Sequence, residues 1–177
     1  HAYTLRRLAT SEERLQLAVD ATHDGVFDWD IEKNTLHTTP QWCLLTGVDE
    51  RPGLGLEDWL DRIHPDDRQE VRKGLDAHIR GETSRFEAEY RVVHEDGAVL
   101  WIHGRAAAVL DSEGAPRRVV GSQCDITQRK HAELDLQYAA THDLITDLPN
   151  RLLLLREAEI ALEANPEGNH VLAVLTV

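Results

Sequence analysis

Alternating apolar and polar positions in residues 25–126 predict a series of short β-strands. Residues 25–31, with the sequence GVFDWDI, place a large apolar side chain at every second position, as a half-buried strand does. A polar turn at residues 33–34 leads into a second short strand, TLHTT. Residues 85–126 predict three longer strands, separated by turns at residues 95–97 and 112–114. The pattern therefore predicts five strands in two groups.

Helical periodicity surrounds and separates these two groups of strands. Residues 3–21 predict a helix whose apolar stripe is Leu5, Leu8 and Leu15. Residues 65–80 predict another, because Pro65 suits a first helical turn and an inward-facing stripe follows it. The members of that stripe are Val71, Leu75, His78 and Ile79. This order predicts an α+β fold: a five-stranded antiparallel sheet with short helices on one face, flanked by N- and C-terminal helices.

A connector helix and an incomplete second domain are expected after the last strand. Thr127 is placed to cap the connector, and Ala132, Leu136 and Ala139 follow at i, i+4 and i+7. The connector contains neither glycine nor proline, which predicts a stiff segment. Another amphipathic helix follows Pro149, and the run VLAVLTV is typical of a buried parallel strand. These last elements predict the beginning of an α/β domain.

The charge of the chain excludes several classes of partner. The chain has 32 acidic and 19 basic side chains, giving a formal net charge of −13. Because this balance repels phosphate backbones and anionic lipids, we expect no nucleic-acid partner and no membrane contact by these residues. Two isolated cysteines, Cys43 and Cys124, suit a reducing cytoplasm. We expect a cytoplasmic location, although a membrane tether could lie elsewhere in a parent chain.

Five segments, in this order and spacing, resemble the PAS family with its C-terminal PAC motif. They are GVFDWDI, PQWCLLTG, IHPDDR, FEAEYRVVHEDGAVLWI and VVGSQCDITQRK. The resemblance covers about residues 11–130 and implies a PAS fold with a sensory or regulatory role. It also implies that Asp125, Ile126 and Thr127 relay a signal from the sheet into the connector helix.

The segment THDLITDLPNR resembles the opening D-x-L-T-x-L-P-N-R motif of GGDEF diguanylate cyclase domains. Ile145 stands where leucine is usual, and the matching residues are Asp143, Thr146, Leu148, Pro149, Asn150 and Arg151. In that family the metal-binding carboxylates and the GGDEF loop come after the first strand. We therefore expect magnesium and GTP to belong to a catalytic part beyond this sequence, and residues 1–177 to be non-catalytic.

Together the two resemblances divide the chain into four parts. Residues 1–10 are an upstream linker helix, 11–127 the PAS/PAC sensory domain, 128–142 the connector helix and 143–177 the start of a GGDEF domain. The resemblance implies that this stretch shapes a turn before the first helix of the domain, and therefore that Asp143 and Asn150 have a structural role. The pair His142-Asp143 is too weak a signal for a metal phosphohydrolase, because further metal-ligating residues are not evident around it.

The sequence leaves the PAS ligand unknown. Large side chains that could line a pocket, or simply fill the core, are Phe27, Trp29, Trp42, His78, Phe86, Tyr90 and Trp101. Trp29 and Trp101 could instead cover the outer face of the sheet. His78 is a weak candidate for a haem ligand, and none of the ten histidines pairs with another at i, i+3 or i, i+4.

Three functions remain open from the sequence. The first is a sensory input that controls cyclic di-GMP synthesis through the connector helix, in response to an unknown small-molecule or protein signal. The second is a cofactor-binding, haem-type sensor. The third is a PAS dimerisation module with another output, such as a histidine kinase. Apolar stripes on both flanking helices predict a homodimer in each case.

Overall fold

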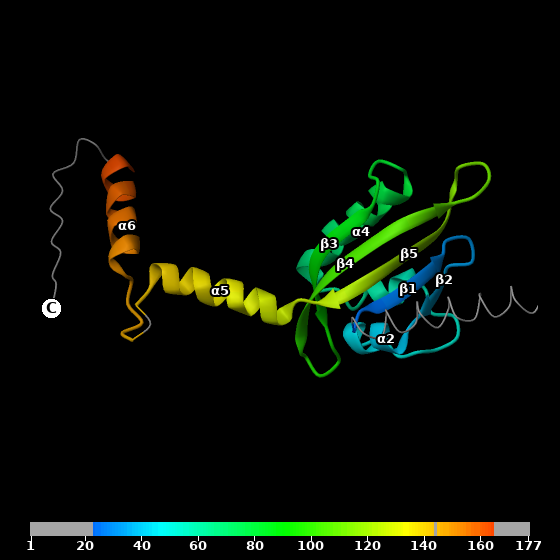
Figure 1. Ribbon diagram of the computed structural model, residues 1–177, viewed down its shortest axis with the longest axis horizontal. Helices are drawn as coiled ribbons and strands as arrows, with labels where there is room; N and C mark the ends of the chain where they lie inside the picture. The colour runs from blue at the N-terminus through cyan, green and yellow to red at the C-terminus, as the bar shows by residue number, and fades with distance from the viewer. Residues whose placement is uncertain (1–22, 144, 165–177) are drawn as a thin grey trace, which may run out of the picture. The chain divides into compact units, whose positions relative to one another are not determined.

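A five-stranded antiparallel sheet is the centre of the fold in the computed structural model, which describes residues 23–143 and 145–164 (Figure 1). Its strands lie in the order β2-β1-β5-β4-β3. They are β1 (Gly25–Asp30), β2 (Thr35–Thr38), β3 (Phe86–Val93), β4 (Val99–Leu110) and β5 (Pro116–Asp125). The sheet and its two groups of strands confirm the predicted α+β fold class.

The register of the central strands decides which side chains face the core. In the pairing of β1 with β5, Gly25 lies opposite Gln123, Phe27 opposite Gly121 and Trp29 opposite Val119. Because side chains alternate along a strand, the odd-numbered residues of this part of β5 point to the inner face. This places a polar residue, Gln123, among apolar neighbours in the middle of the sheet.

Three helices lie between the two groups of strands and cover the inner face. They are α2 (Pro40–Thr46), α3 (Leu56–Leu60) and α4 (Pro65–Ile79). The hydroxyl of Thr39 caps α2 by accepting from the Trp42 N–H, and Gly47 ends α2 in the left-handed conformation at φ 67°. The imidazole of His64 caps α4 by accepting from the Asp66 N–H. These capped ends stabilise helices that are too short to be stable in isolation.

Aromatic and branched side chains fill the space between helices and sheet. The largest fully buried side chains are Trp42, Tyr90, Leu60, Ile63, Ile102, Val92 and Val119, together with the polar Gln123 and Thr46. Burial of one such apolar side chain contributes about 1.5–3 kcal/mol, so this layer is the main source of stability.

The chain divides into two units, the first ending at Thr127 and the second beginning at Gln128. Helix α5 (Thr127–Thr141) starts at this division, and α6 (Arg151–Ala164) follows a turn. The predicted linker helix at residues 1–10, the wider helix at 3–21 and the strand at 171–177 lie outside the described residues. Among the helices of the described ranges, none combines the length and hydrophobicity needed to cross a membrane.

Candidate functional site

The inner face of the sheet encloses a small apolar cavity. Its volume is about 20 Å³, which is room for one water molecule. The residues that line it are Phe27, Trp29, Leu36, Trp42, Leu56, Trp59, Leu75, Phe86, Val119 and Gln123. The side chains themselves therefore occupy nearly all of the space between helices and sheet.

Gln123 is the polar centre of this cavity and is 1% exposed. Three donors face one end of its side-chain amide, which orients the amide with its oxygen toward them. The oxygen then lies 3.1 Å from Tyr90 Oη, 3.3 Å from Trp42 Nε1 and 3.1 Å from Trp59 Nε1. Since a carbonyl oxygen has two lone pairs, this site has a surplus of donors over acceptors.

Tyr90 shares the same buried cluster. Its ring packs edge-to-face against Trp59, with the centroids 5.9 Å apart and the planes at 74°. Burial raises the pKa of the Tyr90 phenol far above its ordinary value, against a smaller lowering by the hydrogen bond with Trp59. The phenol is therefore a neutral hydrogen-bonding group throughout the physiological pH range.

The structure brings together four of the seven residues proposed for a pocket. Phe27, Trp29, Trp42 and Phe86 line the cavity, and Tyr90 lies beside it through its contact with Gln123. The remaining two, His78 and Trp101, lie elsewhere. Gln123 was missed, although a polar residue at an inward position of an alternating strand is a signal that could have identified it.

His78 is a buried structural histidine in this fold. Its side chain is 4% exposed, and its Nε2 accepts a hydrogen bond of 2.9 Å from the Ala108 N–H. Nδ1 therefore carries the proton and donates to the Thr83 carbonyl at 3.0 Å. Because an iron ligand needs an available ring nitrogen, His78 does not fit a haem site. Within residues 23–143 and 145–164, no cluster of three or more histidine, cysteine or acidic residues could hold a metal ion.

Trp101 lies on the opposite face of the sheet and contacts the proposed relay segment through its backbone. Its carbonyl accepts from the Ile126 N–H at 2.8 Å, and its N–H donates to Thr127 Oγ1 at 2.9 Å. The Thr127 N–H donates in turn to Asp125 Oδ1 at 2.8 Å. The prediction that Thr127 caps the connector is wrong, because α5 begins at Thr127 itself and the hydroxyl binds β4 instead. The start of α5 is thus fastened to the sheet.

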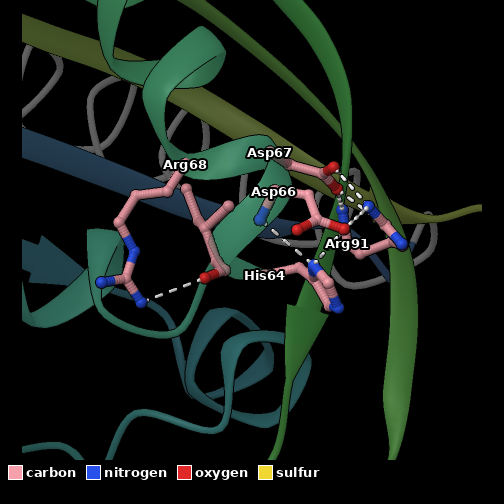
Figure 2. Close-up of polar contacts among 6 residues, drawn as sticks. His64, Asp66, Asp67, Arg68 and Arg91 are labelled. Carbon is pink, nitrogen blue, oxygen red and sulfur yellow. Dashed lines mark hydrogen bonds and ion pairs between the residues drawn. The ribbon is translucent and has the colours of Figure 1, made fainter.

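A second polar cluster, separate from the one around Gln123, joins the first turn of α4 to the edge strand β3 (Figure 2). The carboxylate of Asp67 accepts from the backbone N–H and Nε of Arg91 at 2.9 Å each, and from its Nη2 at 2.6 Å. The guanidinium also lies over the Trp101 ring, 5.6 Å from its centroid. On the other side of the turn, Arg68 donates to the Ile63 carbonyl. The sequence placed these residues in a family motif without assigning them a role.

The ion pair makes a pH-dependent contribution to stability. The hydrogen bond from the Arg91 side chain lowers the pKa of Asp67, against a smaller raising effect of burial. A carboxyl group whose folded pKa is lowered stabilises the fold above its unfolded pKa of about 3.9. That contribution to stability is lost as the pH falls through the lowered pKa of Asp67 in the folded state.

The described residues of the segment THDLITDLPNR connect α5 to α6. The carboxylate of Asp143 accepts from the N–H groups of Ile145 and Thr146 and from the Thr146 hydroxyl, which lowers its pKa. Asn150 caps α6 by accepting from the N–H groups of Leu152 and Leu153, and its amide donates to the Ala140 carbonyl.

The other motif residues complete the turn. Pro149 forms an isolated bridge with His142, Leu148 is exposed, and Arg151 is the first residue of α6. Asp143 and Asn150 therefore bind backbone groups of this turn and of the first turn of α6.

Comparison with known proteins identifies the family of the larger unit. The sequence profile described as the PAS fold matches residues 35–123, half of the chain. The chain belongs to the PAS-fold family. A solved structure of a sensory box histidine kinase/response regulator from Burkholderia thailandensis shares 33% identity and a TM-score of 0.61. The alignment covers 72% of this chain and 95% of that structure.

Two further relatives of this PAS domain are diguanylate cyclases. The solved N-terminal domain of a diguanylate cyclase with PAS/PAC sensor from Marinobacter aquaeolei shares 26% identity, with a TM-score of 0.55, over 61% of this chain and 99% of that structure. The probable diguanylate cyclase DgcE of Escherichia coli shares 27% identity over 67% of this chain and 10% of its own length. The chain spans 10% to 28% of the length of the curated relatives it matches. The relatives thus include a histidine kinase/response regulator as well as diguanylate cyclases.

Proposed function

We propose that the PAS domain is the sensory input of a diguanylate cyclase and controls cyclic di-GMP synthesis through α5. One observation carries this proposal: α5 starts on the PAS sheet at Thr127 and leads into the turn that matches the opening of a GGDEF domain. A helix without a proline or glycine transmits a displacement at its first turn better than a flexible linker would. The similarity to two cyclases supports the same output.

The test is GTP turnover by the full-length protein in the presence of magnesium. We expect cyclic di-GMP to form, and Thr127→Val to change its rate about five-fold or more, the lower end of common coupling energies. Thr35→Val is the matched control, because that hydroxyl contacts only the nearby Lys33 carbonyl among its described hydrogen bonds. Transfer of phosphate from ATP to the protein, with no product from GTP, would identify a histidine kinase and sink the proposal.

We further propose that the protein is a homodimer that pairs through α5. The described residues of this helix include no buried side chain, and Leu134, Leu136 and Tyr138 are exposed. The resemblance to cyclases supports pairing, because joining two GTP molecules requires two catalytic domains to meet. A 15-residue helix is marginal alone, so the dimer should dissociate on dilution.

Light scattering over a range of protein concentrations tests the dimer. We expect a species of twice the 20.0 kDa chain mass at high concentration. Leu136→Glu, at a side chain that is 72% exposed, should weaken association about ten-fold or more. Gln137→Glu adds the same charge at the next position and should have little effect. Equal behaviour of the two variants would place the interface elsewhere.

A further inference from the structure

We propose that Asp67, Arg91 and Trp101 form a relay that couples helix α4 to the first turn of α5. The relay supplies a route by which a change in the core could reach α5, so its use in signalling rests on the function proposed above. Its existence does not, because each contact lies within the PAS unit. The geometry provides three successive links.

The first link joins α4 to β3. Asp67 lies in the first turn of α4, and its carboxylate takes both side-chain and backbone hydrogen bonds from Arg91. The two side chains are only 20% and 28% exposed, so solvent competes weakly for these bonds. The His64 N–H also donates to the Arg91 carbonyl at 2.8 Å. The N-terminus of α4 and this part of β3 must therefore move together.

The second link crosses from β3 to β4. Arg91 lies directly opposite Trp101 in the register of the two strands, on the outer face of the sheet. The guanidinium is held over the indole ring while its own hydrogen bonds point to Asp67. A planar guanidinium can do both at once, which a lysine ammonium cannot. The position of the Trp101 ring is thus tied to the Asp67 carboxylate.

The third link joins β4 to α5. The backbone carbonyl of Trp101 accepts from the Ile126 N–H, and its N–H donates to the hydroxyl of Thr127. The Ile126 side chain is 8% exposed, which anchors the same segment in the packed interior. A shift of Trp101 therefore changes the start of α5 directly.

The cavity provides the input to this relay. Leu75 lines the cavity from α4, two turns after Asp67. A change in cavity filling that displaces α4 therefore also changes the distance between the Asp67 carboxylate and the Arg91 guanidinium. Side chains in a dense interior have few alternative arrangements. We therefore expect α4 to switch between separate positions and not to shift gradually. The relay thus connects the inner face of the sheet to the helix that follows its central strand, β5.

Amide hydrogen exchange of the 177-residue chain tests the relay without any cyclase activity. The readout is the exchange rate at residues 131–134, the first amides of α5 with intrahelical acceptors. We expect Asp67→Asn to raise this rate about five-fold. Arg91→Lys should act in the same direction, since it keeps the charge and loses the fork.

Asp66→Asn is the matched control. Its carboxylate lies one position away, is 72% exposed and contacts Arg91 at 3.4 Å. We expect a change of less than about two-fold for this variant. Exchange of the buried β5 amides in each sample shows whether the domain has stayed folded. Arg91→Lys then decides the question if Asp67→Asn unfolds.

A double-mutant cycle with Thr127→Val separates coupling from two independent effects. If the residues act as one relay, Asp67→Asn combined with Thr127→Val should raise exchange no further than the stronger single variant does. Effects that multiply, or an equal response to Asp66→Asn and Asp67→Asn, would overturn the relay. Neither result would bear on the proposed function, which GTP turnover tests separately.

Discussion

Replacement of Gln123 by leucine is expected to lower the free energy of unfolding by about 3 kcal/mol. The leucine side chain fits the space, but it removes the oxygen on which Tyr90, Trp42 and Trp59 converge. A buried donor without a partner costs about 1–3 kcal/mol, and a cavity of about 20 Å³ has no room for acceptors for all three. Urea denaturation followed by tryptophan fluorescence measures the loss.

Gln69→Leu is the matched control for this prediction. Gln69 lies on the exposed side of α4 in the same unit, so its replacement should change stability by less than about 0.5 kcal/mol. A second comparison isolates the donors: in a Trp59→Phe background the cost of Gln123→Leu should shrink, because one donor fewer is left unpaired. A loss below about 1 kcal/mol for Gln123→Leu would mean that the donors have other acceptors.

Periodicity was sufficient to predict the five strands and the long helix α4 of the PAS unit. The strand expected at residues 25–31 is found at Gly25–Asp30, and the helix expected at 65–80 is found at Pro65–Ile79. Both succeed because local signals agree with the tertiary fold: apolar side chains alternate in the strand, and Pro65 starts the helix at a position where it needs no N–H donor.

The orientation of the aromatic side chains could not be predicted in the same way. In β4 both faces carry apolar residues, because Leu100 and Ile102 alternate with Trp101. Which face of β4 points to the core depends on its pairing with β3. Ile102 lies opposite Tyr90, which is buried in the core, so Trp101 lies on the other face beside Arg91. Register is a tertiary property that the alternation of a single strand does not contain.

The candidate site depended still more on contacts between distant residues. Asp67 and Arg91 are 24 positions apart, and Trp101 and Thr127 are 26 apart. The capping rule made Thr127 a reasonable N-cap, but a hydroxyl can satisfy any nearby donor, and the β4 backbone supplied one. The signal-relay role of Thr127 was predicted from the family resemblance and stays a prediction, whereas the bond to Trp101 shows that its hydroxyl is attached to β4.

Introduction of one methyl group at Gly121 is expected to destabilise the sheet by about 2–3 kcal/mol. A Cβ at this position would lie 2.3 Å from the Arg105 carbonyl oxygen, 2.6 Å from Phe27 Cζ and 2.8 Å from Ala106 Cβ. The nearest of these atoms belongs to the backbone of β4, so relief requires the two central strands to move apart. Overpacking of a dense interior costs about 1–3 kcal/mol, and the cost is highest where the obstacle is backbone.

The same substitution at Gly74 should have the opposite effect, which makes the pair decisive. Gly74 lies within α4, where an added Cβ would be 3.5 Å from Phe86 Cε2, an ordinary contact distance. Gly74→Ala removes the entropic cost of a helical glycine and should raise the free energy of unfolding by about 0.5–1 kcal/mol. Thermal and urea unfolding of both variants should therefore move in opposite directions from the parent protein. If Gly121→Ala instead unfolds at the parent's midpoint, β4 and β5 are not packed as closely as the register of these strands requires.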